Sequence, residues 1–320
     1  MKTAIIGLGI IGIVHKTVLN KLGENLVAVC DVNEKKLAGL KEKTYTDYIE
    51  LLEKEKPDVV HVCTPHYLHA EMITEALSRD INVLCEKPLC IKAEDIPRII
   101  RAEKNSKGIL GVCHQNRYNA ANAYVKEYLK DKEIVSAHGS VVWNRDAAYY
   151  AQDAWRGKKA TEGGGVLINQ ALHTLDLMQW FCGMPDSVTA SVDNLSLKGV
   201  IEVEDTASLL CKGKTNFTFF ATNAGGADMP VEVTIKLKNG DVVAVYPDRL
   251  TINGKAVCTE VIDNADRKCC YGNGHEKLVA DFYECVRTGV KFPIDGEEAA
   301  KVIKIILAAY ESGVKPVKIR

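Results

Sequence analysis

Three glycines near the amino terminus have the spacing that binds the pyrophosphate of a dinucleotide. They lie in the segment Gly7-Leu8-Gly9-Ile10-Ile11-Gly12, between a short apolar run and a helical pattern. Gly7 allows a tight turn after a strand, Gly9 lets the backbone approach a pyrophosphate, and Gly12 lets the helix pack closely on the sheet. The free N–H groups at the start of that helix favour an anion. We therefore predict a dinucleotide site that includes Ile10 and Ile11.

An acidic residue after the second apolar run indicates which dinucleotide binds. The run 26–30 ends at Asp31. Its carboxylate can accept hydrogen bonds from ribose hydroxyls and would repel a 2′-phosphate, so we predict NAD as the cofactor. Lys35 and Lys36 follow closely and favour a phosphate, which leaves NADP as the less favoured alternative.

A lysine with catalytic chemistry follows the apolar run 81–85, in the segment Glu86-Lys87-Pro88. Beside a bound nicotinamide, a partly desolvated Lys87 can hydrogen-bond a substrate hydroxyl and help to hold or move its proton. The alternative is an ordinary surface lysine at a turn. The position at the carboxyl end of a predicted strand favours the functional interpretation.

A second group of polar residues follows the glycines at 163–165, where a helix is predicted to begin. Asn169, His173 and Asp176 are spaced i, i+4 and i+7, so they share one helix face. His173 is the best acid–base candidate in the chain, because an imidazole titrates near neutral pH. The alternative is a core histidine that is hydrogen-bonded by Asp176.

Two further segments offer groups that suit a hydroxylated ligand. Trp155-Arg156-Gly157 places a guanidinium fork beside an indole, although such pairs also pack at interfaces. The segment from Tyr271 to His275 offers a phenol and an imidazole in a glycine-containing loop. We predict substrate-binding roles for Trp155, Arg156, Tyr271 and His275.

The elements that position these residues form two domains. Up to Tyr118, strand-like and helical patterns alternate, which predicts an α/β, doubly wound parallel sheet. The predicted strands are 3–6, 26–30, 58–63, 81–85 and 109–113, and helices are predicted after Gly12 through Val14, Val18 and Leu22, over 68–78 and over 94–105. Ligands gather at the carboxyl ends of such strands, where Gly9, Asp31, Thr64, Glu86, Lys87 and Gln115 lie. We predict a dinucleotide-binding domain over 1–118.

Residues 119–320 have a different pattern and predict an α+β domain with a mostly antiparallel sheet. Alternating segments run over 134–143, 187–196, 206–222, 231–237 and 242–246, and helices are predicted at 121–129, 275–287 and 297–312. Asn239-Gly240 and Asn253-Gly254 are strong hairpin signals. Asp295 is positioned to cap the last helix, with Glu298 completing a capping box.

Composition limits the class of protein. The 320 residues carry a formal net charge of −1, without the basic excess of a nucleic-acid-binding protein. No apolar run is long enough to span a bilayer, and three glycines interrupt the only stretch that resembles a signal peptide. The eleven cysteines include no CxxC pair, so we predict no metal site and a reducing, cytoplasmic location. We expect neither a nucleic acid nor a membrane as a partner.

Taken together, these motifs resemble the Gfo/Idh/MocA oxidoreductase family. The resemblance covers essentially the whole chain. The motifs that carry it are Gly7-x-Gly9-x-x-Gly12 with His15, Thr64-Pro65 with His69, Glu86-Lys87-Pro88, Gln115-Asn116-Arg117-Tyr118, and the segment from Gly163 to Asp176.

The resemblance implies NAD-linked oxidation or reduction at a secondary hydroxyl of a sugar, a sugar derivative or a cyclitol. Lys87 would contact the reacting hydroxyl and the cofactor, and His173 would accept or donate its proton. The resemblance also implies an open-faced sheet in the second domain that forms a homodimer or homotetramer. The remaining site residues that it implies are Thr64, Pro65, His69, Glu86 and Gln115 for the cofactor, and Tyr118 and Asn169 for the substrate.

One departure from the family pattern concerns Asn169, because many relatives have aspartate at this position. An amide can bind the substrate but adds no negative charge beside His173 or Lys87. Two alternative functions also stay open. One is NAD-dependent glycoside hydrolysis through transient oxidation, with Tyr118 or Tyr149 as an additional base, and the other is a non-catalytic nucleotide sensor.

Overall fold

The computed structural model describes residues 1–259 and 272–319, which divide into two compact units. One unit comprises residues 1–114 and 275–300, and the other comprises residues 115–274 and 301–320. The predicted domain boundary after Tyr118 lies close to the first division. The prediction differs for 275–300, which it assigned to the second domain.

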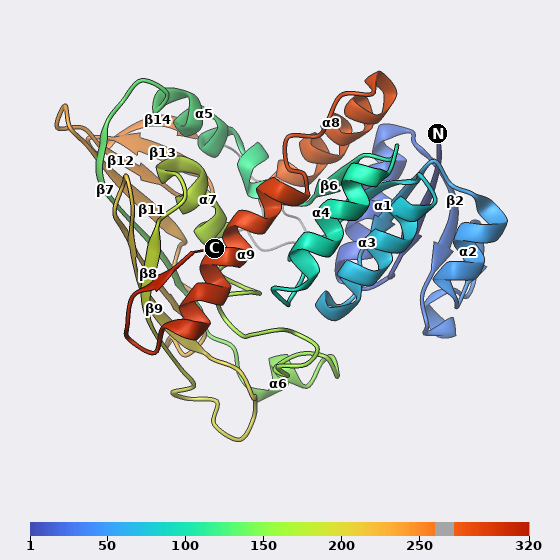
Figure 1. Ribbon diagram of the computed structural model, residues 1–320, viewed down its shortest axis with the longest axis horizontal. Helices are drawn as coiled ribbons and strands as arrows, with labels where there is room; N and C mark the ends of the chain where they lie inside the picture. The colour runs from blue at the N-terminus through green and yellow to red at the C-terminus, as the bar shows by residue number, and fades with distance from the viewer. Residues whose placement is uncertain (260–271, 320) are drawn as a thin grey trace. The chain divides into compact units, whose positions relative to one another are not determined.

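The first unit is built around a six-stranded parallel sheet in the order β3-β2-β1-β4-β5-β6. The strands are β1 (Lys2–Ile6), β2 (Asn25–Cys30), β3 (Lys43–Tyr45), β4 (Val59–Val62), β5 (Asn82–Cys85) and β6 (Leu110–Val112). The intervening helices, seen in Figure 1, are α1 (Ile10–Leu22), α2 (Tyr48–Glu55), α3 (His69–Ser78) and α4 (Asp95–Asn105). The chain builds the sheet outward from β1 in one direction through β2 and β3, and in the other direction through β4, β5 and β6. In such sheets ligands bind at the carboxyl ends of the strands next to this change of direction.

Two elements of this sheet region, β3 and α2, were not predicted from the sequence. Both are short, and α2 is highly charged, so neither has a clear apolar period. The Asp47 side chain caps α2 by accepting a hydrogen bond from the Ile49 N–H at 2.7 Å. That cap fixes the start of a helix too short to be stable alone.

Helix α8 (Gly274–Thr288) and the start of α9 (Gly296–Ser312) pack against this sheet although they come late in the chain. Gly111 of β6 leaves room for Phe282, whose ring lies 2.7 Å from where a Cβ would be. The Ile294 carbonyl accepts a hydrogen bond from the Val112 N–H at 2.9 Å. These contacts are long-range, which is why the sequence pattern alone did not assign 275–300 to the first unit.

The second unit contains a nine-stranded mixed sheet in the order β14-β13-β12-β11-β7-β10-β9-β8-β15. Only β7 and β10 pair in parallel, so the predicted mostly antiparallel sheet is confirmed. The strands are β7 (Ile134–Val142), β8 (Ser187–Asp193), β9 (Thr206–Lys212), β10 (Phe217–Thr222), β11 (Glu232–Leu237), β12 (Val242–Val245), β13 (Arg249–Ile252), β14 (Lys255–Thr259) and β15 (Val317–Lys318). The segment 206–222, predicted as one run, is therefore two strands joined by a turn.

Both predicted hairpins form. Asn239-Gly240 joins β11 to β12, and Asn253-Gly254 joins β13 to β14. Asn253 and Gly254 have φ values of 52° and 75°, the left-handed conformation that this tight turn requires. Asp295 also caps α9 as predicted, by accepting a hydrogen bond from the Glu298 N–H at 2.7 Å.

Helices of the second unit cover one face of its sheet. Figure 1 shows α5 (Ala120–Tyr128) and α7 (Leu172–Cys182) on the same side of it, and the short α6 (Ala147–Tyr150) lies apart from them. Gly139 of β7 permits the close approach of α7, because a Cβ there would lie 2.9 Å from the Met178 sulfur. The strands alternate buried and exposed residues, so the other face of the sheet is exposed.

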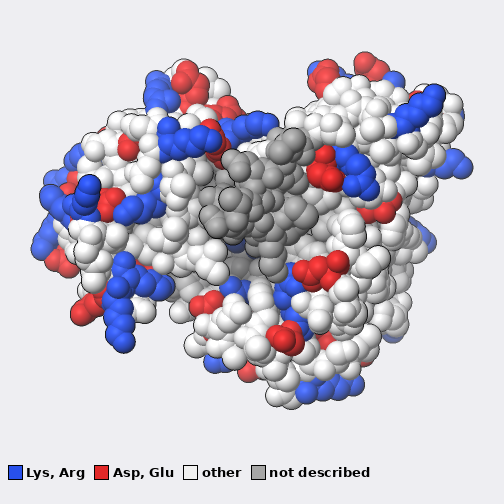
Figure 2. Space-filling view, turned by 180° about the vertical axis from the view of Figure 1, so that it is seen from behind, with Lys and Arg blue, Asp and Glu red and all other residues white. Residues whose placement is uncertain are grey.

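The charged side chains on the face in Figure 2 are mixed, with acidic and basic groups interspersed rather than gathered into one basic patch. Among the described residues, no helix combines the length and the apolar character that crossing a membrane requires.

Candidate active site

The glycine-rich turn after β1 has the geometry of a pyrophosphate cradle. Gly7 has a φ of 94°, and a Cβ at Gly12 would lie 1.9 Å from the Gly7 carbonyl oxygen. The fold itself therefore requires both glycines. A Cβ at Gly9 would meet no protein atom within 4 Å. Helix α1 begins next to Gly9 without a side-chain cap, so its first N–H groups suit an anion.

Asp31 is held in place at the end of β2 by two backbone donors. Its carboxylate accepts hydrogen bonds from the N–H groups of Leu8 and Asn33 at 2.8 and 2.9 Å. Lys36 forms an ion pair with the same carboxylate at 3.0 Å. From the sequence, Lys36 favoured binding of the 2′-phosphate of NADP. It instead forms an ion pair with Asp31, the residue expected to repel that phosphate.

His69 connects the loops that follow β4 and β5. Its ring nitrogens lie 2.8 Å from the Thr64 carbonyl oxygen and 2.7 Å from that of Pro88. The ring is fully buried, and burial lowers the pKa of His69, while the two backbone carbonyls raise it. His69, which we predict to bind the cofactor, thus contacts the segments Thr64-Pro65 and Glu86-Lys87-Pro88.

Glu86, immediately before the half-buried Lys87, is a buried carboxylate with two histidine neighbours. His15 Nε2 lies 2.9 Å from Glu86 Oε1, and His275 Nε2 lies 3.6 Å from the same oxygen. Burial alone would raise the pKa of Glu86, but the hydrogen bond from His15 and the proximity of His275 hold it well below its usual value. His275, predicted as substrate-binding, thus lies beside Glu86 in the first unit. These three groups also lie close enough to ligate a metal ion.

A chain of buried hydrogen bonds continues from His15 into the core. His15 Nδ1 lies 2.7 Å from His61 Nδ1, His61 Nε2 lies 3.0 Å from the Tyr283 hydroxyl, and that hydroxyl lies 2.8 Å from Thr3 Oγ1. If His15 donates to Glu86 as a neutral ring, its Nδ1 must accept from His61, which must accept from Tyr283. Each member then has one definite role.

In the second unit, another buried carboxylate holds the glycine segment. Glu204 accepts hydrogen bonds from the Gly165 and Leu167 N–H groups at 2.8 and 3.0 Å and from the Tyr310 hydroxyl at 3.0 Å. Burial raises the pKa of Glu204 to about 7. Helix α7 begins only at Leu172, so Asn169 lies in the turn before it and not on the helix face predicted from the sequence.

His173 lies in the first turn of α7 and is 8% exposed. Its Nε2 lies 3.4 Å from the amide nitrogen of Gln115, a residue predicted to bind the cofactor. Asp176 directs its two carboxylate oxygens to Arg117, at 2.7 and 2.6 Å. An amide N–H beside Nε2 favours the tautomer in which this nitrogen can accept a proton.

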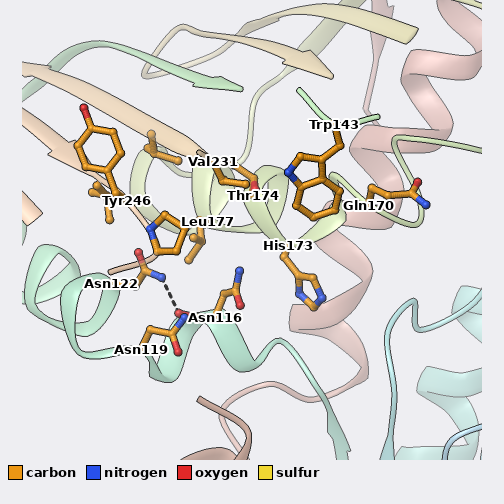
Figure 3. A pocket seen from close by; sticks show the side chains of 13 residues that line it. Asn116, Asn119, Asn122, Trp143, Gln170, His173, Thr174, Leu177, Val231 and Tyr246 are labelled. Carbon is orange, nitrogen blue, oxygen red and sulfur yellow. Dashed lines mark hydrogen bonds between the residues drawn. The ribbon is translucent and has the colours of Figure 1, made fainter. Parts of the chain in front are cut away.

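A pocket of the second unit extends along His173 (Figure 3). Asn116, Asn119 and Asn122 line one part of it, and His173 and Trp143 line another. The remaining lining residues are Gln170, Thr174, Leu177, Val231, Val233, Val245, Tyr246 and Pro247. Its volume of about 30 Å³ suits one or two water molecules, so this pocket alone is too small for a sugar ring.

The predicted Trp155–Arg156 pair is connected to this region by hydrogen bonds. The Arg156 guanidinium lies 4.9 Å from the Trp155 ring and donates to the Tyr149 hydroxyl at 2.6 Å. Gln170 donates to the same hydroxyl at 3.1 Å. Asn223 in turn donates to Gln170 at 3.0 Å. Of the other predicted substrate residues, Tyr118 ends the short 3-10 helix 115–118, and Tyr271 lies outside the described residues.

Sequence reasoning missed Gln170, Asn223, His61, Tyr283 and Glu162 as members of these networks. His61 had a signal, because it is the one polar residue in the apolar run 59–63. Gln170 had the weaker signal of following Asn169. Asn223 and Tyr283 depend on contacts between segments that are distant in sequence, whereas Glu162 contacts Gly157 and Asn169 nearby in the chain.

Comparison with known proteins agrees with this geometry. Residues 1–114 match the description "Oxidoreductase family, NAD-binding Rossmann fold", and residues 124–262 match the Gfo/Idh/MocA C-terminal domain. The chain belongs to the Gfo/Idh/MocA oxidoreductase family. This result confirms the family, the fold class and the type of enzyme predicted from the sequence, and the Rossmann fold of this family binds NAD.

Members of the Gfo/Idh/MocA family with known roles resemble the chain over different lengths. Myo-inositol 2-dehydrogenase of Thermotoga maritima is 26% identical over 98% of this chain and 96% of that protein. The structure of the WlbA dehydrogenase from Chromobacterium violaceum with NADH and UDP-GlcNAcA has a TM-score of 0.88 and 25% identity, and the match covers 100% of this chain and 96% of that one. The 2,7-anhydro-N-acetylneuraminate hydratase of Mediterraneibacter gnavus is 29% identical over 62% of this chain and 55% of that protein.

Proposed function

We propose that this protein is an NAD-dependent dehydrogenase or reductase acting on a secondary hydroxyl or ketone of a sugar, a sugar derivative or a cyclitol. The observation that carries the proposal is His173, an almost buried imidazole whose Nε2 lies 3.4 Å from the amide nitrogen of Gln115. Such a surrounding suits the recognition of hydroxyl groups around a proton acceptor.

In this mechanism the bound nicotinamide supplies the hydride acceptor or donor. His173 takes the proton from the substrate hydroxyl during oxidation and returns it during reduction. Lys87 holds the same hydroxyl and stabilises negative charge that develops on its oxygen. Glu86, kept ionised by His15 and His275, fixes the backbone of the loop that carries Lys87, because it accepts the Lys87 N–H at 3.2 Å.

The cofactor and substrate class have separate supports. The Leu8–Asp31 hydrogen bond and the Asp31–Lys36 ion pair support NAD over NADP. The near full-length likeness to a myo-inositol 2-dehydrogenase supports a cyclitol or sugar, and the likeness to a dehydrogenase solved with UDP-GlcNAcA supports a nucleotide-linked sugar as an alternative.

One other activity has support in the comparisons. A hydratase acting on an anhydro sugar is among the relatives, so transient oxidation that eliminates a leaving group is a second candidate. In that reaction the cofactor is regenerated in every cycle. Tyr149, whose hydroxyl is contacted by Arg156 and Gln170, is the candidate for the additional base.

We also propose that the exposed face of the large sheet joins copies of the chain into a dimer or tetramer, with Val135, Leu210 and Val242 exposed on these strands. The nine described cysteines form no disulfide with one another, which supports the proposal of a cytoplasmic location.

A substrate panel tests the function. Inositols, sugars, nucleotide sugars and glycosides are incubated with NAD or NADP, and reduced cofactor and released product are measured separately. Formation of reduced cofactor supports the dehydrogenase, and product without reduced cofactor supports the second candidate. Binding of NAD without any turnover would contradict both.

The H173A variant tests the acid–base residue. We expect turnover to fall by roughly 10²–10⁴-fold while NAD affinity is unchanged, because the imidazole moves the proton but does not hold the cofactor. Lys130→Ala is the control, since Lys130 is exposed after α5 and, among the described residues, forms an ion pair only with Glu127. Turnover of H173A close to wild type would refute the assignment.

A further inference from the structure

Glu162 is a buried carboxylate immediately before the three glycines, and its side chain joins two candidate substrate segments. It has 0% exposure. Glu162 Oε1 accepts a hydrogen bond from Asn169 Nδ2 at 2.5 Å, and Oε2 accepts one from the Gly157 N–H. A carboxylate accepts hydrogen bonds and donates none, so both partners must present an N–H group to it.

This contact fixes the orientation of the Asn169 amide. The nitrogen must face Glu162, and the oxygen Oδ1 therefore lies at the opposite end of the amide group. Asn169 keeps 9% of its surface exposed. The amide therefore presents its oxygen, a hydrogen-bond acceptor, on the side away from Glu162.

We propose that Glu162 and Asn169 act as a single unit, in which Glu162 is a positioning residue that makes Asn169 Oδ1 the acceptor for a substrate hydroxyl. The part of this inference that concerns the substrate rests on the proposed function. The pair carries its one carboxylate on residue 162, where it orients the amide of residue 169.

Exchanging the acid and the amide between residues 162 and 169 should still leave an oxygen acceptor on residue 169. In the double variant E162Q/N169D, the amide introduced at position 162 accepts the Gly157 N–H with its oxygen and donates to the aspartate, which presents its other oxygen outward. In E162Q alone, the introduced amide turns its nitrogen toward Asn169, and Asn169 must turn its own nitrogen outward. In N169D alone, two carboxylates meet at about the same short distance and must share a proton.

Steady-state kinetics of the four proteins test the proposal. We expect each single variant to lower kcat/KM for the substrate by roughly 10–100-fold, mainly through KM, because a hydrogen bond to the substrate is lost or reversed. The double variant should recover most of this loss. N169D alone should add an ionisation to the pH profile that wild type and the double variant lack. Affinity for NAD should stay unchanged in all four.

Glu204→Gln is the matched control, because it removes another buried carboxylate that binds the backbone of the same segment. N169D should not rescue that variant. If N169D fails to rescue E162Q, or rescues E204Q equally well, the proposed unit is refuted.

Thermal melting separates this inference from the proposed function. The same four variants are melted without substrate, and the double variant should regain most of the melting temperature lost by the single variants. If the double variant regains its melting temperature but the wild-type protein turns over no compound, the proposed function is refuted and the Glu162–Asn169 pair stands. Turnover by wild type without rescue in either assay would refute the pair and keep the function.

Discussion

Glu204 makes the stability of this protein depend on pH, and the variant E204Q tests the reason. The side chain is buried, and its three donors are the Gly165 and Leu167 N–H groups and the Tyr310 hydroxyl. Burial raises the pKa of Glu204 from its ordinary 4.5 to about 7, because the hydrogen bonds offset only part of the cost of removing the carboxylate from water.

The size of the effect follows from this shift. The pKa rises by about 2.5, and each unit corresponds to about 1.4 kcal/mol, so the ionised side chain lowers the free energy of unfolding by about 3 kcal/mol. The native state binds the proton more tightly than the unfolded state. The free energy of unfolding therefore falls as the pH rises from about 4.5 to about 7, and this contribution is constant outside that window.

Denaturant unfolding of wild type and E204Q between about pH 4 and pH 8.5 measures this contribution. The amide that replaces Glu204 in the variant cannot ionise, so the wild-type curve should fall by about 3 kcal/mol relative to that of the variant as the pH rises. Any hydrogen bond that the amide loses shifts the E204Q curve by a constant amount. Parallel curves across the whole range would refute the reasoning. Burial also raises the pKa of Glu103 to about 7. The variant E103Q therefore provides a second test, in which the free energy of unfolding of wild type should again fall relative to that of the variant as the pH rises.

Two further variants test the ion pairs of the two units. Arg117→Met leaves Asp176 buried without its partner guanidinium, so we expect the free energy of unfolding in urea to fall by about 3–5 kcal/mol. The double variant R117M/D176L should recover part of this loss. A fall of under about 1 kcal/mol would show that the pair is not stabilising. Asp31→Ser removes the ribose acceptor and releases Lys36, so we expect kcat/KM with NAD to fall by roughly 10–100-fold relative to that with NADP; an unchanged ratio would contradict the role of Asp31.

The first unit was largely predictable because its signals are local. A glycine turn followed by a helix, and an acid at the end of a strand, each depend on a few consecutive residues. Gly7, Gly12 and Asp31 accordingly have the surroundings that their spacing predicts. The position of α8 was not predictable in the same way, since it depends on contacts such as that between Tyr283 and Thr3.

The polar residues of the second unit were predicted by type but not by arrangement. The spacing of Asn169, His173 and Asp176 suggested one helix face, yet α7 begins after Asn169. The pattern could not reveal this start, because the backbone of 165–167 is held by Glu204 from another segment. The partner of Asp176 is Arg117, which precedes it by a whole strand and two helices.

Three buried carboxylates share a role that connects these observations. Glu86 accepts hydrogen bonds from His15 and from the backbone N–H of Lys87. Glu162 and Glu204 accept them around the segment that leads to His173. Each acid draws donors from two different segments, so each fixes a loop more firmly than an apolar contact would.

These carboxylates lie beside the candidate functional residues and not among them. Placed one residue back, as Glu86 is from Lys87, or behind an amide, as Glu162 is behind Asn169, the acid orients the group that faces the ligand. The orientation of the Asn169 amide therefore depends on the buried carboxylate of Glu162 behind it.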